Sequence, residues 1–226
     1  MGKVTILNET TKNPISLMGY AAGYCWDANI KDKDKNIKRG LECIKFGHHR
    51  VMEYPQIYLE IDGYSARVIR EWTRHIGGLS TYLQASTRYI DYTNFDCVIP
   101  ESIESDVKSR WIYCDTMEEI AKNIEKLVSL GIPKEDAAML LPLGMQTKII
   151  WRGNLRTLYD MSRVRLCSRA YWEYRELLKE VLFKLSEYQD EWDILINEEK
   201  IFAPKCEDYG FCNEKNGCGR RPKRVK

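Results

Sequence analysis

Alternating apolar and polar positions predict two strands in the first third of the chain. The stretch QIYLEI at 56–61 places Ile57, Leu59 and Ile61 on one face, and Asp62–Gly63 is expected to end this strand in a turn. The stretch KVTIL at 3–7 predicts another, shorter strand. The chain is therefore expected to begin a sheet early.

Helical periodicity appears between and after these strands. Residues 37–47 have apolar positions at helical spacing and end at Gly47. Ser65 is expected to cap a further helix, which should end near His75 because Gly77–Gly78 stop it. The apolar side of this helix comprises Val68, Ile69 and Trp72.

The second half of the chain is mainly helical by the same criterion. Asp115 and Glu118 have the spacing of a capping box, which predicts a helix that ends at Gly131. Its apolar stripe comprises Ile120, Ile124, Leu127 and Val128. Pro133 suits the first turn of a following helix, and that helix should break around Pro142.

A last helical pattern runs from about Asn154 to Gln189 and is unusually long. Early strands followed by late helices predict an α+β fold, with a mixed or antiparallel sheet and long helices. We expect one catalytic domain over residues 1–204 and a cysteine-containing basic tail over 205–226. The tail, KCEDYGFCNEKNGCGRRPKRVK, has too few apolar residues for a core of its own.

Composition narrows the class of protein. The 226 residues are 44% hydrophobic, which suits one large domain with an appendage. A net charge of +2 argues against general nucleic-acid binding. No apolar run is long enough to predict a membrane span, and the start MGKVTILNETTKNP lacks the apolar core of a signal peptide. We therefore expect a cytoplasmic protein whose eight cysteines are thiols.

Arginines on the last helical pattern are candidates for anion binding. They are Arg156, Arg163, Arg165 and Arg169. A solvated helix face paired with carboxylates is the alternative explanation. Arg165 stands out because apolar or small residues surround it in sequence, and an arginine in such surroundings needs an anionic partner.

The stretch RHIGGLSTYLQASTRY at 74–89 is a second candidate anion site. Arg74 and His75 precede two glycines, which allow a backbone to approach a ligand closely. Ser86 and Arg88 add groups that bind phosphate. A plain turn with a structural histidine is the alternative.

No metal site and no cysteine nucleophile are predicted. His48–His49 lie near Glu53, but the chain has three histidines and no matching second cluster. Cys206, Cys212 and Cys218 could bind zinc but lack a fourth ligand nearby in sequence. The other cysteines have no neighbouring histidine to act as a base.

Three blocks of sequence resemble the flavin-dependent thymidylate synthases, from about residue 3 to the tail. The family's first signature is Arg-His-Arg, followed by Ser and then Arg-Tyr. Residues 74–76 (RHI) and 86–89 (STRY) resemble it. LLPLGMQTK at 140–148 and NLRTLYDMSRVRLCSRAYWEYREL at 154–177 resemble its second signature. GHHRVMEYP at 47–55 resembles the segment that supplies a glutamate near the flavin.

The chain departs from the family pattern at several positions. Ser86 follows Arg74 by twelve positions, two more than usual, and Ile76 stands where the family has arginine. Lys148 replaces a common arginine and keeps its charge without its bidentate geometry. The other replacements of common residues are Glu71, Gln84, Asp160 and Arg169.

The resemblance implies an enzyme that reductively methylates dUMP to dTMP. FAD would be its cofactor, and methylenetetrahydrofolate and NADPH its co-substrates. Arg165 is the implied catalytic residue, placed beside the uracil to favour its N3-ionised form. The implied FAD-binding residues are Glu53, Arg74, His75, Ile76, Gln84, Asn154, Leu155, Arg156 and Asp160. The implied nucleotide-binding residues are Glu71, Arg74, Gln84, Ser86, Thr87, Arg88, Lys148 and Arg165.

The resemblance also implies a homotetramer whose sites are shared between subunits, with neither nucleic acid nor membrane as a partner. Two other functions stay open. The altered signature could belong to a different flavin-dependent enzyme that modifies pyrimidine nucleotides. Less favoured is a non-catalytic nucleic-acid-binding protein that uses the basic tail.

Overall fold

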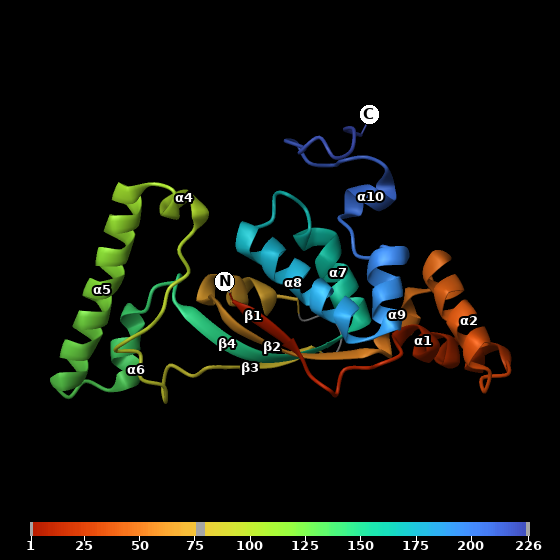
Figure 1. The fold of residues 1–226 in the computed structure, drawn as a ribbon, viewed down its shortest axis with the longest axis horizontal. Coiled ribbons are helices and arrows are strands. Elements are labelled where there is room, and N and C mark those ends of the chain that lie inside the picture. Colours follow the sequence, from red (N-terminus) through yellow and green to blue (C-terminus); the bar gives the residue numbers. More distant parts are fainter. Residues whose placement is uncertain (1, 76–79, 225–226) are drawn as a thin grey trace. The chain divides into compact units, whose positions relative to one another are not determined.

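The described residues form a four-stranded antiparallel sheet combined with helices (Figure 1). A computed structural model describes residues 2–75 and 80–224. The strand order is β1-β2-β4-β3. The strands are β1 (Lys3–Ile6), β2 (Gln56–Ser65), β3 (Thr81–Gln84) and β4 (Gln146–Asn154). The predicted α+β class is confirmed, and the sheet is of the antiparallel kind.

The described part of the chain divides into two compact units. The first unit consists of Met1–Lys3, Ile61–Thr73 and Leu83–Ile150, of which residue 1 is not described. The second consists of Val4–Glu60, Arg74–Tyr82 and Trp151–Lys226, of which residues 76–79 and 225–226 are not described. β2 and β4 contribute residues to both units.

The longest strand, β2, confirms one prediction and corrects another. Ile57, Leu59 and Ile61 are fully buried, as the alternating pattern predicts. The predicted turn at Asp62–Gly63 is wrong, because the strand continues to Ser65. Gly63 has a φ of 72°, so glycine absorbs a local distortion within the strand without reversing its direction.

The patterns do not predict β3 or β4. In β4 the buried positions alternate, with Thr147, Ile149 and Trp151 turned inward. One inward residue is polar and the outward Ile150 is apolar, so the sequence QTKIIWRGN gives only a weak strand signal. This strand leads directly into the helix that frames the candidate site.

Two helices of the second unit pack backbone against backbone. They are α1 (Pro14–Gly23) and α2 (Lys33–Lys45). A Cβ added to Gly19 would lie 1.7 Å from the carbonyl oxygen of Asn36, and one added to Gly40 would lie 2.3 Å from that of Ile15. Glycine is therefore required at this crossing. The chain then turns through η1 (Tyr24–Trp26) before α2 and through η2 (His49–Glu53) after it.

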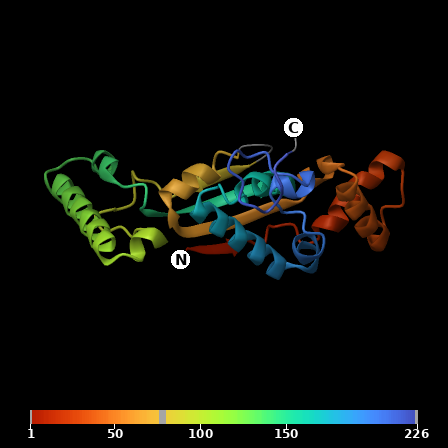
Figure 2. The same cartoon turned by 90° about the horizontal axis from the view of Figure 1, so that it is seen from above.

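The single long helix predicted from Asn154 to Gln189 is wrong. The structure has α7 (Leu155–Arg165) and α8 (Trp172–Tyr188), separated by residues 166–171 (Figures 1 and 2). Arg175 stabilises this break, because its Nη1 donates to the carbonyl oxygens of Ser168 at 2.7 Å and Ala170 at 2.6 Å. Arg165 and Arg169 therefore do not share a helix face.

The second unit buries its core beneath α8 and the segment that follows it. The buried face of α8 includes Tyr174, Leu177, Leu178 and Val181. Next come α9 (Asp190–Asp193) and the π-helical turn η4 (Ile194–Glu198). Trp192 is fully buried, and its Nε1 donates to the carbonyl oxygen of Thr11 at 2.8 Å.

The first unit contains α3 (Ala66–Trp72), α4 (Glu101–Glu104), α5 (Val107–Ser129), α6 (Lys134–Ala137) and η3 (Ala138–Leu140). Ser65 caps α3 through its hydroxyl, as predicted, and Val68, Ile69 and Trp72 are fully buried. The helix ends at Trp72, and the predicted stop at Gly77–Gly78 lies outside the described residues.

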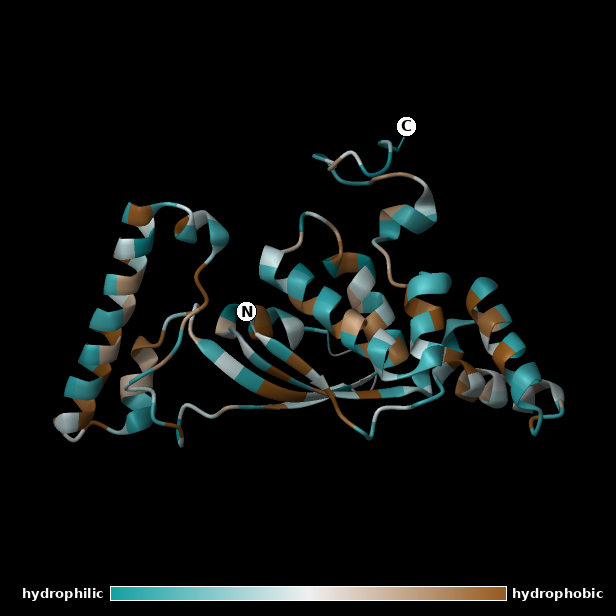
Figure 3. Ribbon diagram, viewed as in Figure 1, coloured by the Kyte–Doolittle hydropathy of each residue, from teal (hydrophilic) through white to brown (hydrophobic). Residues whose placement is uncertain are grey.

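The start predicted for α5 at Asp115 is wrong. Asp106 caps the helix, with Oδ2 accepting from the backbone N–H of Ser109 at 2.8 Å, so Asp115 lies two turns inside it. Of the predicted apolar stripe, Ile124 alone is buried among these described residues, and teal and brown bands alternate along α5 (Figure 3). The predicted end at Gly131 is confirmed, because this glycine follows the helix with a φ of 85°.

The tail contains the short helix α10 (Lys205–Tyr209), which ends at Gly210 with a φ of 70°. Further along, Cys212 forms a parallel bridge with Lys223. The domain boundary at residue 204 stays a prediction. Within the described residues, no helix is long and apolar enough to cross a membrane.

Candidate active site

A polar pocket of about 450 Å³ lies at the beginning of α7, within the second unit. Its lining residues are Arg50, Glu53, His75, Asn154, Arg156, Thr157 and Asp160. They come from η2, from the segment after α3 and from the first turns of α7. Segments that are far apart in sequence thus meet around one polar space.

Asn154 fixes the start of α7. Its buried side chain accepts hydrogen bonds at Oδ1 from the backbone N–H of Thr157 at 2.8 Å and from the hydroxyl of Thr157 at 2.9 Å. The next residue, Leu155, donates its N–H to the carbonyl oxygen of Pro55 at 3.0 Å. This cap and this bond hold the first turn of α7 beside the end of η2.

Charges of both signs line the pocket. Arg156 Nε and Asp160 Oδ2 form an ion pair of 2.9 Å across one turn of α7. The Arg156 guanidinium also lies 5.9 Å from the centre of the Tyr159 ring. Arg50 and Glu53 on η2 are exposed. The pocket therefore presents two guanidinium groups together with two carboxylates.

Arg165 contacts His75 at the end of α7. Its Nε donates to His75 Nε2 at 3.0 Å, although the two residues are 90 positions apart in sequence. The same guanidinium lies 4.7 Å from the centre of the ring of Tyr174, a fully buried residue on α8. The His75 and Tyr174 rings make an edge contact, with centroids 6.1 Å apart. Side chains from two other segments thus orient the guanidinium.

The pKa of His75 is lowered, because burial disfavours its charged form and because the Arg165 cation lies beside it. A neutral imidazole is also what the geometry needs, since Nε2 accepts the hydrogen bond from Arg165. The ring proton is therefore assigned to Nδ1. The pKa of His49 is likewise lowered, first by burial and then by the charge of Arg156.

Most residues predicted to bind the nucleotide belong to the first unit. Gln84 Nε2 donates to Thr147 Oγ1 at 3.4 Å. The Ser86 hydroxyl accepts from the backbone N–H of Arg88 at 3.2 Å, and Arg88 Nε pairs with Glu135 at 2.8 Å. Thr87 and Lys148 are exposed, while Glu71 is half-buried near the end of α3. The carbonyl oxygen of Lys148 accepts from the N–H of Ala85 at 3.0 Å, which ties this short segment to β4.

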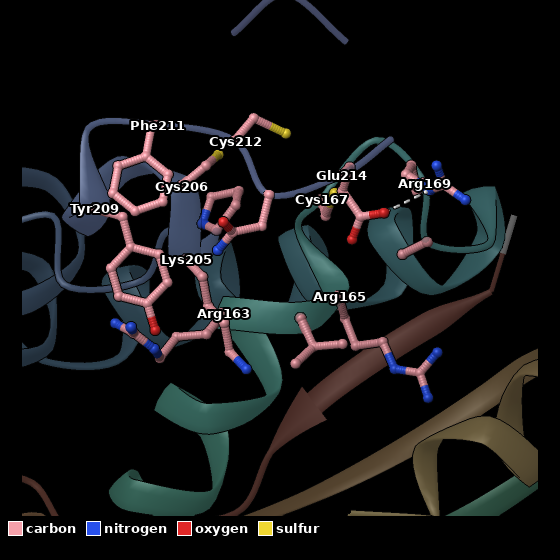
Figure 4. Close-up of a pocket in the computed structure, with 14 residues that line it drawn as sticks. Arg163, Arg165, Cys167, Arg169, Lys205, Cys206, Tyr209, Phe211, Cys212 and Glu214 are labelled. Carbon is pink, nitrogen blue, oxygen red and sulfur yellow. Dashed lines mark ion pairs between the residues drawn. The ribbon is translucent and has the colours of Figure 1, made fainter. Parts of the chain in front are cut away.

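Three arginines predicted from the last helical pattern, Arg163, Arg165 and Arg169, line a different pocket (Figure 4). For Arg163, the alternative explanation of a solvated helix face paired with carboxylates holds in part. Arg163 is paired with Asp208 and donates to the Tyr159 hydroxyl at 2.7 Å, but its side chain is only 14% exposed. Arg169 lies in the segment between α7 and α8 and pairs with Glu214 at 3.3 Å. In Figure 4 the Arg165 guanidinium points away from the other labelled side chains of this pocket.

Sequence reasoning missed Arg50 and Thr157, which line the pocket. Arg50 lies three residues before Glu53 in the block GHHRVMEYP, so its position within that block was the available signal. Thr157 was signalled by its spacing of three from the capping residue Asn154. Among the predicted residues, Arg74 is exposed and the Leu155 side chain is fully buried. Ile76 lies outside the described residues.

Comparison with known proteins assigns the family. A family model described as thymidylate synthase complementing protein matches residues 6–188. The chain belongs to this family. A flavin-dependent thymidylate synthase of Pyrococcus furiosus is 29% identical, and the match covers 99% of this chain and 96% of that protein. A protein of the same name from Pyrococcus abyssi is 30% identical, and the match covers 98% of this chain and 95% of that protein. Another from Clostridium tetani is also 30% identical, with coverages of 97% and 94%.

Membership makes the chain an enzyme of the flavin-dependent thymidylate synthase family. The match includes every segment that contributes to the polar pocket, because residues 50–53, 75 and 154–160 all lie within it. It ends before the cysteine-containing tail. The pocket is therefore the candidate active site, and the tail is a feature that the family model does not cover.

Proposed function

We propose that this chain reductively methylates dUMP to dTMP, using FAD as cofactor and methylenetetrahydrofolate and NADPH as co-substrates. The observation that carries the proposal is the contact between Arg165 and His75 at the end of α7. It unites the two signature blocks through which the chain resembles the family. The family assignment and the relatives' names support the same activity.

The donor set of the pocket fits FAD. Arg50 and Arg156 provide guanidinium groups of the kind that bind a pyrophosphate in bidentate fashion. Glu53 and Asp160 provide acceptors for ribose hydroxyls, and the positive N-terminal end of α7 faces the same space. When bound, FAD supplies the redox and one-carbon transfer chemistry that amino-acid side chains lack. We assign its binding to Glu53, Arg74, His75, Ile76, Gln84, Asn154, Leu155, Arg156 and Asp160.

Arg165 is assigned the chemical role. A guanidinium beside the uracil stabilises the base in its N3-ionised form, which makes C5 more nucleophilic. Such a charge is effective only if its position is fixed before the reaction. The hydrogen bond to neutral His75 and the face of Tyr174 provide that fixation.

The nucleotide would be held by Glu71, Arg74, Gln84, Ser86, Thr87, Arg88, Lys148 and Arg165. The Arg88 side chain is available to a phosphate at little cost, because its pair with Glu135 is exposed at both partners, 65% and 51%. Exposed pairs of this kind contribute about 0–1 kcal/mol. A phosphate dianion is therefore able to displace Glu135.

The proposed reaction needs no cysteine nucleophile. Among the described residues that line the pocket, none is a cysteine. Cys167, which follows Arg165 by two positions, lines the pocket shown in Figure 4, to which Arg165 also contributes. The described lining of the polar pocket at the start of α7 therefore supports a route in which no thiol attacks the base.

Product analysis tests the proposal. The purified protein is incubated with FAD, NADPH, methylenetetrahydrofolate and either dUMP or dCMP, and the nucleotides are then separated by chromatography. We expect dTMP from dUMP and no methylated product from dCMP. A methylated or otherwise modified product from dCMP alone would instead assign a different flavin-dependent pyrimidine-modifying activity. A colourless protein that neither binds flavin nor forms product, but retains nucleic acid through its tail, would support the non-catalytic alternative.

A further inference from the structure

Four cysteines of the second unit line one small cavity. They are Cys167, Cys206, Cys212 and Cys218, all within the described residues. Cys167 comes from the segment between α7 and α8, Cys206 from α10, and the other two from the rest of the tail. Cys206 and Cys212 are drawn with Cys167 in Figure 4. Three separate segments thus contribute cysteines to the lining of one cavity.

The fold supplies the ligand that the tail lacks in sequence. Cys206, Cys212 and Cys218 are spaced six apart, and three thiols alone leave a tetrahedral metal site incomplete. Cys167 provides a fourth thiol from a position 39 residues before the first of them. Arg220 and Ser168 also line this cavity.

The tail has little apolar burial to hold it. From Lys205 to Arg224, all within the described part, no residue is buried. Its contacts include surface ion pairs, such as Arg169–Glu214 at 3.3 Å and Arg220–Glu207 at 3.8 Å. Pairs of this kind contribute little. Small segments without a core are commonly stabilised by a metal or another cross-link.

Basic side chains border the four thiols, because Arg169 and Arg220 line the same cavity. Basic residues of the tail would also offset the excess negative charge of a site with four thiolates.

We propose that Cys167, Cys206, Cys212 and Cys218 bind one zinc ion and so fasten the tail to the segment that follows Arg165. Four thiols and Zn²⁺ give a tetrathiolate complex and release four protons to solvent, with no change in oxidation state. Among the described residues, no three potential ligand side chains already stand close enough to hold a metal ion. Binding therefore requires the four thiols to turn into the cavity that they share, to the Zn–S distance of about 2.3 Å.

Zinc accounts for this arrangement better than a disulfide. All the cysteines in the described structure are free. A single disulfide would use only two of the four thiols, and two disulfides would need an oxidant that the structure does not supply. A tetrathiolate site uses all four, and closed sites with four cysteines are a common structural zinc type. The proposal does not depend on the nucleotide or the flavin.

The test is elemental analysis of the full chain, purified without chelator. We expect one zinc ion per chain. Cys206→Ser and Cys167→Ser should each reduce the zinc content to background, because a closed structural site needs all four ligands. Cys114→Ser changes an exposed thiol on α5 and should keep the zinc.

A second measurement on the unmodified chain avoids dependence on variants that fail to fold. Protein stripped with chelator is titrated with Zn²⁺, and trypsin cleavage within the tail, for example after Lys215, is followed by mass spectrometry. Zinc should bind at a one-to-one ratio and slow this cleavage. No uptake of zinc, zinc retained by the Cys167 and Cys206 variants, iron with sulfide in its place, or a disulfide among the four cysteines would each overturn the proposal.

Discussion

Arg165 owes its position to side chains from other segments. Its Nε is held by His75, and its guanidinium lies against the Tyr174 ring. We expect Arg165→Ala to fold and bind FAD but to lose about a hundred- to thousand-fold in kcat, as is typical when one preorganised charge is removed. Arg165→Lys should recover only part of the rate, because an ammonium lacks the planar fork. Steady-state kinetics with dUMP measures both.

The control for this prediction is Arg110→Ala. Arg110 forms an exposed ion pair with Glu104 at 3.0 Å, so its loss should change kcat by no more than a few-fold. Arg163, two positions before Arg165, is unsuitable as a control because its largely buried side chain pairs with Asp208 and Tyr159. Equal losses at Arg165 and Arg110 would remove the assignment of Arg165 as the base-activating residue.

The lowered pKa of His75 predicts a pH dependence of stability. A histidine has a pKa of about 6.5 in an unfolded chain. Because the folded value is lower, the unfolded state binds more protons as the pH falls, so the free energy of unfolding should decrease below about pH 6.5. The loss continues until the pH passes the lower, folded pKa. Urea denaturation between pH 8 and pH 5 measures this slope.

Replacement of His75 tests the source of that slope. His75→Gln offers Arg165 an uncharged acceptor and should flatten the decrease, leaving only the part due to His49. His48→Gln changes an exposed side chain and should keep the wild-type slope. An unchanged slope in His75→Gln would mean that this histidine is not the group that titrates.

Individual site residues were predictable to the extent that local sequence carried their chemistry. Arg165 was identifiable because an arginine among apolar and small residues requires a partner. Its partner His75 is 90 positions away, and no local pattern encodes that contact. Arg163 illustrates the same limit, because its ion-pair partner Asp208 lies 45 positions away in the tail.

At the scale of elements, the start of α5 gives a direct test. Asp106→Ala removes the observed cap and should lower the free energy of unfolding by about 1 kcal/mol. Asp115→Ala, inside the helix, should change it by less than about 0.5 kcal/mol, because surface substitutions away from caps have small effects. Chemical denaturation of both variants measures the difference. A larger loss for Asp115→Ala would contradict the helix start seen in the structure.

Helix and strand boundaries were predicted well where local signals were strong. The caps at Ser65 and Gly131 follow from side-chain and backbone requirements that sequence shows directly. The break between α7 and α8 was not predictable in this way. Residues 166–171 contain neither glycine nor proline, and Arg175 stabilises their turn through carbonyl groups that only the folded chain presents.

At the scale of the whole molecule, the order of early strands and late helices predicted the class of fold. The division into two units could not be predicted from that order. β2 and β4 each give residues to both units, so neither unit is a continuous stretch of sequence. Composition and periodicity report on neighbours along the chain and cannot reveal such a division. The pocket of the second unit likewise combines segments that only tertiary folding brings together.

The homotetramer stays a prediction, and α5 offers a place to test it. Val107 and Trp111 are one turn apart and are 84% and 66% exposed. Exposed apolar residues on one helix face are typical of contacts between subunits. Light scattering should give the mass of a tetramer for the wild type and a lower mass for Trp111→Ser. The exposed Lys122→Ser should keep the wild-type mass, and an unchanged mass for Trp111→Ser would remove α5 from the interface.

Flavin binding by the pocket at the start of α7 is the central claim, and a spectroscopic titration with FAD tests it most directly. We predict saturable binding of one FAD per chain. Arg156→Ala should weaken binding about ten- to a hundred-fold, the cost of one charge-assisted hydrogen bond. Lys179→Ala, in an exposed pair on α8, should bind FAD like the wild type. A folded protein that binds no FAD, or one whose affinity is unchanged in Arg156→Ala, would contradict the account.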